Sequence, residues 1–312
     1  MTPAQIAGKV VVFTGNESKT WSLADVITAC ATIRRLGADT LCMKYADGGI
    51  SWHSPNDMEH YHAVANGLGC GLCGFQYCYG PAFGDLTKQV TDEAAIANSM
   101  IGHLPLIVLD MEKEFDGHPE AAIFLHQHLQ VPPGQLAITT WANPAQHAWI
   151  GDVAALNQDA IWIPQEYTSF LAKQDRSSMT TIWPAIDLSS EFGPNDPVGI
   201  IAHAHPASAW VWALSLITRG EPFQTELQQI CHEAGNPAPP PRPAPATTDT
   251  ITVQQYPALL STLWGIALQW GTNAQAVYNR NQKTIEDAAH EHGLPSSDNG
   301  NIIYEGEVLY RP

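Results

Sequence analysis

The sequence predicts an α/β protein in which a (β/α)8 TIM-type barrel is joined by a Pro-rich linker to a small βααβ domain. Three observations lead to this fold class. Eight short apolar runs recur along the first two thirds of the chain, helix-like stretches separate most of them, and a Pro-rich segment isolates the tail. Near-continuous apolar strands are typical of parallel sheets covered by helices, and eight βα units are the number that closes such a barrel.

The eight predicted strands are rich in Val, Ile, Leu, Phe, Trp and Tyr. They are expected at residues 10–14, 40–45, 70–77, 106–110, 136–141, 160–164, 181–186 and 208–214. Amphipathic, helix-like segments lie between them at residues 22–36, 57–67, 86–101, 118–129 and 143–157, whereas the connections near 170–175 and 195–204 are short.

An open, doubly wound sheet is the main alternative arrangement of the same units. In that fold, the first strand of a nucleotide-binding protein is followed by G-x-G-x-x-G. The first apolar run here is not followed by this glycine motif, and the chain has no G-x-x-x-x-G-K-[ST] loop. The barrel is therefore favoured, nucleotide binding is disfavoured, and no cofactor is expected.

The Pro-rich segment marks a domain boundary. Residues 236–249 read NPAPPPRPAPATTD, in which six residues are Pro. Such a sequence prefers the extended polyproline II conformation and acts as a semi-rigid spacer. We therefore expect a barrel over residues 1–234, a linker over 235–249 and a small domain over 250–312.

The charge balance excludes several kinds of partner. Lys and Arg number 14 against 31 Asp and Glu, which gives a net charge of −17 and argues against nucleic acid and anionic membranes. No apolar run approaches the ~20 residues of a membrane span, and no signal peptide is visible. Neutral sugars, held by hydrogen bonds and by stacking on some of the ten Trp rings, remain compatible with this negative charge.

Cysteine and histidine patterns do not predict a metal site. Cys70-x-x-Cys73 has no second CxxC or His pair after it, so buried, reduced thiols are expected rather than a metal or redox centre. The same holds for the other cysteines, Cys30, Cys42, Cys78 and Cys231. In His126-x-His128 and His203-x-His205 the two rings point apart on helix-like segments.

The chemistry of a (β/α)8 barrel lies at the carboxyl ends of its strands. These ends are rich in carboxylates and aromatic rings, the composition of a sugar site: Asn16, Glu17, Lys44, Asp47, Gln76, Tyr77, Tyr79, Asp110, Glu112, Thr140, Trp141, Gln165, Glu166, Tyr167, Asp187, Trp210 and Trp212. Among them, we expect a substrate to contact Asn16, Glu17, Tyr77, Tyr79, Trp141, Tyr167 and Trp212.

The most informative motif is Asp110-x-Glu112, which follows the fourth apolar run. On a strand, residues i and i+2 face the same side, so both carboxylates are expected at the barrel mouth. Repulsion and partial burial should raise the pKa of one of them, and glycoside hydrolysis needs a protonated acid of this kind. The alternative is a structural pair that caps the next helix or binds a basic residue.

With Asp110-x-Glu112 at the end of strand four, the barrel resembles glycoside hydrolase family 25, the lysozyme-like muramidases, and more weakly the chitinase-like family 18. The resemblance implies that Glu112 is the general acid and that Asp110 orients the substrate N-acetyl group, itself an internal nucleophile. Asp187 would correspond to a further family aspartate. The first-strand aspartate of the family is replaced by Asn16 and Glu17, so Glu166 or Glu17 is expected to take part, or activity is lost.

The tail resembles a LysM domain, which has a βααβ fold. The resemblance rests on Val253, Thr262-Leu263-Trp264-Gly265-Ile266-Ala267, Trp270-Gly271-Thr272, Asn279 or Asn281, and Gly306-Glu307-Val308-Leu309. It implies glycan binding through Thr262, Leu263, Trp264 and Asn279, with protein docking as the alternative. The resemblance also implies a second helix that ends near Asn279 or Asn281. Residues 283–301 are then expected to form an insertion that contains a helix-like stretch at 284–292.

Together, these patterns predict a peptidoglycan hydrolase of the muramidase or endolysin type that cleaves β-1,4 bonds of an N-acetylated cell-wall glycan. Two alternatives stay open: an inactive barrel that anchors or builds part of a phage tail or injection apparatus, and a chitinase-like or amidase activity. Action at the bacterial cell wall is expected, after release by lysis or within a phage-like particle.

Overall fold

The computed structural model divides the chain into two compact units, and the division falls after Ala238. Each unit is described by itself. The structure describes residues 10–81, 86–116, 118–132, 134–141, 161–165, 181–182, 185–188, 198, 201, 208–220, 222–235, 250–253, 263–270, 274–292, 295–297, 303–304 and 306–312.

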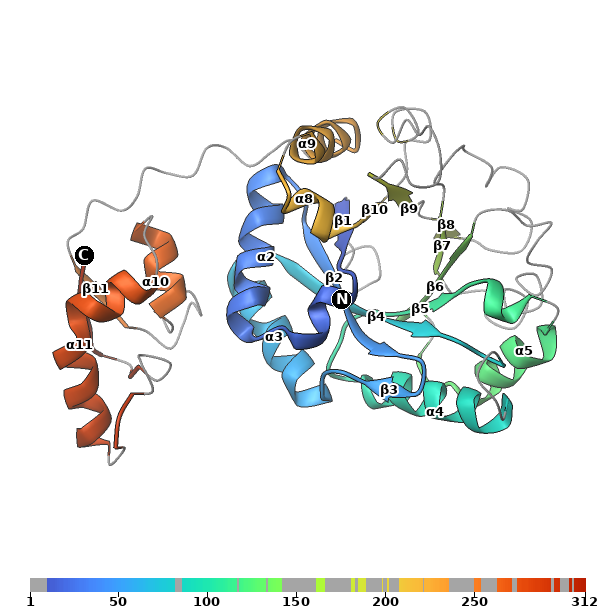
Figure 1. The fold of residues 1–312 in the computed structure, drawn as a ribbon, viewed down its shortest axis with the longest axis horizontal. Coiled ribbons are helices and arrows are strands. Elements are labelled where there is room, and N and C mark those ends of the chain that lie inside the picture. The colour runs from blue at the N-terminus through green and yellow to red at the C-terminus, as the bar shows by residue number, and fades with distance from the viewer. Residues whose placement is uncertain are drawn as a thin grey trace. The chain divides into compact units, whose positions relative to one another are not determined.

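The first unit is a closed barrel of parallel strands, as predicted (Figure 1). Following the sheet from one neighbour to the next, the strands are β1 (Val10–Phe13), β2 (Thr40–Asp47), β4 (Gly71–Cys78), β5 (Ile107–Met111), β6 (Leu136–Trp141), β7 (Ile161–Gln165), β9 (Ala185–Asp187) and β10 (Ala209–Trp212). β1 pairs with both β2 and β10, which closes the ring. All eight predicted strands are therefore confirmed.

Two short strands add to the barrel. The predicted strand at 181–186 is divided into β8 (Thr181–Ile182), which pairs with β7, and β9. β3 (Ile50–Ser51) runs antiparallel to β2 and forms a small hairpin beyond the barrel strand.

Helices α2 (Leu23–Leu36), α3 (Pro55–Gly67), α4 (Leu86–Ser99) and α5 (Pro119–His128) occupy predicted helical segments. α2 begins at a capping box formed by Ser22 and Asp25 and ends at Gly37, whose φ of 104° favours glycine. At the start of α3, the Asp57 carboxylate accepts hydrogen bonds from the Ser54 backbone N–H and hydroxyl.

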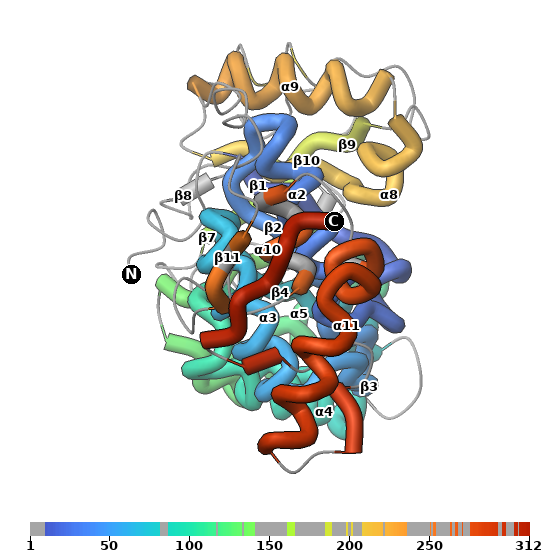
Figure 2. Tube along the Cα trace, turned by 90° about the vertical axis from the view of Figure 1, so that its left-hand side faces the viewer, coloured from blue at the N-terminus to red at the C-terminus, as the bar shows by residue number. Residues whose placement is uncertain are grey.

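The last part of the barrel unit contains α8 (Leu214–Ile217) and α9 (Phe223–Glu233). α9 lies beside α2, although the two helices are far apart in the sequence (Figure 2). The Arg35 guanidinium donates a hydrogen bond to Gln224 Oε1 across this contact. The predicted helix at 143–157 and the connection at 170–175 lie outside the described residues, as does most of 195–204.

The interior of the barrel is filled by alternate residues of each strand. Its buried cluster contains Val11, Phe13, Cys42, Cys73, Phe75, Leu106, Val108, Ala137, Ile161, Ile163, Ala185 and Trp210. Phe13 packs against Phe75 and Trp210 with ring centroids 5.3 and 5.1 Å apart. All six cysteines are buried free thiols, which confirms that prediction.

The second unit has the predicted βααβ order: β11 (Thr250–Thr252), α10 (Leu263–Trp270), α11 (Ala274–Glu291) and β12 (Val308–Tyr310). β11 and β12 pair antiparallel, and Val253, Ile266, Trp270, Val277 and Leu309 are among the residues of their common core.

The helix-like stretch expected at 284–292 is helical to Glu291, but it does not belong to an insertion. α11 continues without a break from Ala274 to Glu291, as the long red helix in Figure 2 shows. Buried Val277, Asn281, Ile285 and Ala289 recur every four residues along it, and no Gly or Pro interrupts this pattern. The segment taken for an insertion therefore begins as an extension of the second helix.

Among the helices of the described residues, none is long and apolar enough to cross a membrane.

Candidate active site

The alternation that fills the barrel core also determines which side chains reach its mouth. On each strand, the residue two positions after the last residue of the buried cluster also faces the barrel interior, but it lies at the carboxyl end of the sheet. Seven of these positions are Lys44, Tyr77, Asp110, Thr139, Gln165, Asp187 and Trp212. The candidate site is thus built directly on the core, with Trp212 packed on the rings of Phe13 and Phe75 beneath it.

Asp110 is almost completely buried at the carboxyl end of β5. Its side chain is 3% exposed, and its Oδ1 accepts a hydrogen bond of 3.0 Å from Gln165 Nε2. Burial raises the pKa of the Asp110 carboxyl well above its usual range, and the nearby charges of Glu112 and Glu114 raise it further. The expected elevated pKa at this motif therefore belongs to Asp110.

Gln165 is the partner that fixes Asp110. It is 7% exposed, and its Nε2 also lies 3.4 Å from Thr139 Oγ1. Within the described part of the chain, its Oε1 is buried and has no hydrogen-bond partner. A buried acceptor without a donor is unfavourable by about 1–3 kcal/mol, so this oxygen favours a bound group that donates an N–H or O–H.

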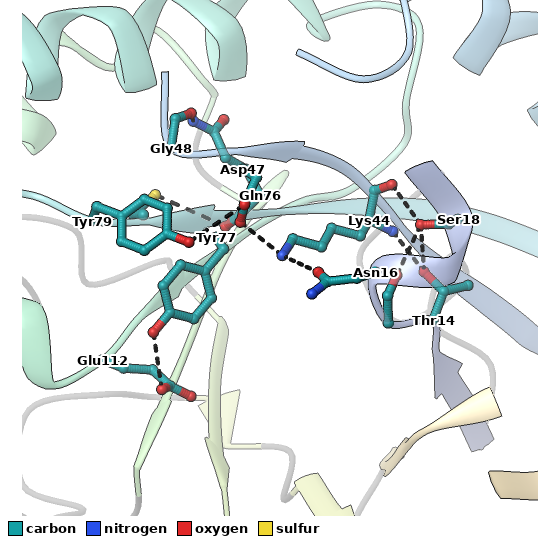
Figure 3. Close-up of polar contacts among 12 residues, drawn as sticks. Thr14, Asn16, Ser18, Lys44, Asp47, Gly48, Gln76, Tyr77, Tyr79 and Glu112 are labelled. Carbon is teal, nitrogen blue, oxygen red and sulfur yellow. Dashed lines mark hydrogen bonds and ion pairs between the residues drawn. The ribbon is translucent and has the colours of Figure 1, made fainter. Parts of the chain in front are cut away.

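Tyr77 connects two carboxylates nearer the surface. Its hydroxyl lies 3.2 Å from Glu112 Oε2 and 3.1 Å from Glu114 Oε2, and Figure 3 shows the contact with Glu112. Burial and the charges of both carboxylates raise the pKa of Tyr77 far above its usual value, so the phenol keeps its proton and acts as the donor. Glu112 follows β5, and Glu114 lies in the 3-10 turn η2 (Lys113–Phe115).

Lys44 joins the ends of the first two barrel strands. Its Nζ lies 2.8 Å from Asn16 Oδ1 and 2.8 Å from Asp47 Oδ1, as seen in Figure 3. The ammonium group also lies over the rings of Trp52 and Tyr77, 4.8 and 5.3 Å from their centroids. This buried cation sets the position of Asn16 and gives the acidic mouth one positive charge.

The backbone of Lys44 is held as firmly as its side chain. The Thr14 hydroxyl accepts a hydrogen bond from the Lys44 N–H, and the Ser18 hydroxyl donates one to the Lys44 carbonyl. Ser18 belongs to the 3-10 turn η1 (Asn16–Thr20) that follows β1. The turn and strand β2 are therefore connected at the position from which Lys44 enters the mouth.

Tyr79 is supported from outside the barrel by Glu93 of α4. The Glu93 carboxylate is fully buried and accepts hydrogen bonds from the backbone N–H groups of Tyr79 and Gly80 and from Gln89. Burial raises the pKa of Glu93 to about 7. The Tyr79 ring lies against Tyr77, and its hydroxyl is 3.4 Å from Asp47 Oδ2.

Most of the described candidate residues lie at the mouth, and they differ in exposure and in hydrogen bonding. Asp187 is 2% exposed at the end of β9. Glu17 is exposed, and its Oε1 accepts a hydrogen bond of 2.7 Å from the Gly15 N–H. Its carboxylate is therefore bound to the backbone at the start of the same turn. Trp141 ends β6, but its side chain lies outside the description, as do Glu166 and Tyr167 entirely.

Sequence reasoning did not identify Glu114, Thr139, Glu93 or Trp52 as parts of the site. Glu114 extends the alternation of Asp110 and Glu112 by one more step, so a search for D-x-E-x-E would have found it. Glu93 and Trp52 leave no comparable signal, because tertiary packing brings Glu93 of α4 against the backbone of Tyr79 from outside the barrel and Trp52 against Lys44.

In the second unit, the predicted glycan-binding residues differ in their exposure. Leu263 is 4% exposed and belongs to the core, where its side chain stabilises the unit and is not available to a sugar. Asn279 is exposed on α11 and accepts a hydrogen bond from Gln275. Thr262 and the side chain of Trp264 lie outside the described residues.

Among the described residues, no group of three His, Cys, Asp or Glu side chains is arranged to hold a metal ion. His128 of α5 bonds the Phe124 carbonyl and packs on the Phe124 ring, which accounts for its position. His203 and His205 lie outside the described part of the chain.

Comparison with known proteins yields similarity of fold only. No protein-family model matches the chain, and no curated protein matches it either. A solved structure of the pneumococcal virulence factor StrH, from work on N-glycan recognition and hydrolysis, matches with 8% identity and a TM-score of 0.46, covering 74% of this chain and 83% of that chain.

Two further solved structures match in the same way. One contains a GH20 catalytic module of the pneumococcal exo-β-D-N-acetylglucosaminidase StrH, with 9% identity, a TM-score of 0.43, and 74% and 85% of the two chains covered. The other is phospho-2-dehydro-3-deoxyheptonate aldolase from Thermotoga maritima, with 8% identity, a TM-score of 0.40, and 74% and 70% covered. Their names describe a glycosidase and an aldolase, so the function of this chain has to be argued from its own residues.

Proposed function

We propose that the barrel is a glycoside hydrolase that cleaves β-1,4 bonds in an N-acetylated cell-wall glycan of the peptidoglycan type. The observation that carries this proposal is the row of three carboxyl groups, Asp110, Glu112 and Glu114, at the carboxyl end of β5. Burial raises the pKa of Asp110, and the hydroxyl of Tyr77 lies within hydrogen-bonding distance of both Glu112 and Glu114. Glycosidic bond cleavage needs both a proton donor and a negative charge near the anomeric carbon.

Glu112 is the general acid in this proposal. It is only half-buried, so its carboxyl can reach the oxygen of a bound glycosidic bond, whereas Asp110 lies two residues deeper and is fixed by Gln165. The free Oε1 of Gln165 would accept a hydrogen bond from a hydroxyl or amide N–H of the sugar. The rings of Trp52, Tyr77 and Tyr79 give the mouth an aromatic lining, and the Lys44 ammonium group lies over the rings of Trp52 and Tyr77.

The second unit has the role of a wall-binding module in this proposal. A weak glycan-binding module joined to a hydrolase raises the effective concentration of substrate at the active site. The βααβ order and the exposed position of Asn279 are compatible with this role, and docking to another protein remains the alternative for the same unit.

A second candidate function rests on one observation. Where the resemblance to the muramidases implies an aspartate after the first strand, this chain has Asn16, whose amide oxygen is bound to the Lys44 ammonium group. A neutral amide held in this way supplies no negative charge. The corresponding proposal is an inactive barrel that binds wall glycan as an anchoring or structural part of a phage-like particle.

Purified Gram-positive cell walls separate the two candidates. The wild-type protein should clear the walls and release reducing ends, and Glu112→Gln should lower the rate about 100-fold or more, because a general acid contributes that much. Release of free amines without reducing ends would instead indicate an amidase. Wall binding without any release by the wild type would overturn the hydrolase and support the anchoring role.

A further inference from the structure

The hydroxyl of Tyr77 is placed between two acceptors, although it carries only one hydrogen. Its contacts of 3.2 Å with Glu112 and 3.1 Å with Glu114 are both within hydrogen-bonding distance. Tyr77 can therefore donate to only one carboxylate at a time. Among the described residues, neither carboxylate has another hydrogen-bond partner or a basic partner, so each has oxygen lone pairs available for a substrate.

The two contacts also limit the separation of the carboxylates. The two contacting oxygens lie against one hydroxyl, so they are at most about 6.3 Å apart. This limit admits the ~5–5.5 Å of retaining glycosidases and lies just below the ~6.5–9.5 Å that leaves room for water in inverting ones. A pair at this separation is suited to protonation on one side of a glycosidic bond and direct attack from the other.

Other described carboxyl groups at the mouth are less suited to attack. Asp110 and Asp187 are buried to at least 97%. Asp47 forms an ion pair with Lys44, and the Glu17 carboxylate accepts the Gly15 N–H. Glu114 is half-buried, and its oxygen faces the same hydroxyl as the general acid, Glu112.

We propose that Glu114 is the catalytic nucleophile and that the barrel acts by double displacement with retention of configuration. This inference rests on the proposed glycosidase function. In the first step, an oxygen of Glu114 forms a bond to the anomeric carbon while the glycosidic C–O bond breaks, and the Glu112 proton passes to the leaving oxygen. In the second step, Glu112 takes a proton from water, the water oxygen bonds to the anomeric carbon, and the ester bond to Glu114 breaks.

This assignment differs from catalysis by the N-acetyl group of the substrate, in which no enzyme carboxylate becomes bonded to the sugar. An activated 2-deoxy-2-fluoro-β-glycoside distinguishes the two, because it has no acetamido group. The wild-type protein should become labelled, and peptide mass spectrometry should locate the sugar on Glu114. A sugar on another carboxyl, or no label on a protein that cleaves wall glycan, would overturn the assignment.

Variants give an independent test with an aryl di-N-acetylchitobioside as substrate. Glu114→Ala should lose at least about 100-fold in rate, and sodium azide should restore turnover by forming a glycosyl azide of inverted configuration. Azide rescue also demonstrates that the variant is folded. Glu112→Gln should lose much less on this activated substrate, because a good leaving group needs little protonation.

The exposed carboxylate Glu120 of α5 provides the matched control, and Glu120→Gln should behave as the wild type. If Glu114→Ala keeps its activity while Glu112→Gln loses cleavage of wall glycan, the nucleophile assignment fails and the proposed hydrolase stands. If the wild type cleaves neither wall glycan nor the aryl glycoside, the proposed function is overturned and this inference with it.

Discussion

Glu93 shows how one buried side chain outside the barrel affects both stability and the mouth. Its carboxylate accepts the backbone N–H groups of Tyr79 and Gly80, and burial raises its pKa from 4.5 to about 7. Between these two pH values, the folded protein keeps a proton that the unfolded chain releases. The stability that this proton contributes is complete below about pH 4.5 and is lost as the pH rises through about 7.

We therefore expect the free energy of unfolding of the wild type, measured against Glu93→Gln, to fall by about 3 kcal/mol between pH 4.5 and pH 8. Urea titrations at several pH values measure this difference. Asp92→Asn changes the half-exposed neighbouring carboxyl of α4 and should keep most of the wild-type profile. Parallel pH profiles for wild type and Glu93→Gln would show that Glu93 does not titrate in this range.

At the scale of single elements, the continuous α11 is the clearest difference from the expected fold. The family likeness implied a helix ending near Asn279 or Asn281, followed by an insertion, whereas buried Ile285 and Ala289 carry the same helix face two turns farther. Local spacing was therefore a better guide here than the resemblance. Asn281 ties this face to β12, because its amide donates to the Tyr310 carbonyl and accepts the Tyr310 N–H.

Thr284→Pro tests this continuity. Thr284 is exposed within α11, and Pro in a helix interior removes a backbone hydrogen bond and clashes with the preceding turn, at a cost of about 3 kcal/mol. Thermal unfolding followed by circular dichroism should show this loss for the C-terminal unit, with Thr284→Ala close to the wild type. Equal stability of the Pro and wild-type proteins would mean that the helix is interrupted at this position.

At the scale of the whole molecule, the fold was predictable and the site only in part. Parallel strands buried on both faces require uninterrupted apolar runs, and such runs are visible in sequence, so all eight barrel strands were located. The strand period also placed Asp110 and Glu112 at the mouth. Glu114 continues this period by one step, whereas the contact of Lys44 with Trp52 depends on the path of the chain after β2 ends, which no period encodes.

The net charge of −17 is a further property of the entire chain. Raising the salt concentration from 0.01 M to 0.1 M shortens the screening length from about 30 Å to about 10 Å and weakens repulsion among the excess carboxylates. We expect Tm to rise by a few degrees, as scanning calorimetry would measure. A flat or falling Tm would mean that attractive pairs such as Lys44–Asp47 outweigh the general repulsion.

Closure of the ring through β1 has a consequence for the order in which the chain can assemble on the ribosome. Val10 of β1 pairs with Ala209 of β10, so one side of the first strand has no partner until nearly the whole barrel sequence has been synthesised. Until then, the nascent sheet exposes two open edges that other chains can pair with. Such non-local pairing slows folding, so this protein should depend on chaperones or slow synthesis more than a helical protein of the same length.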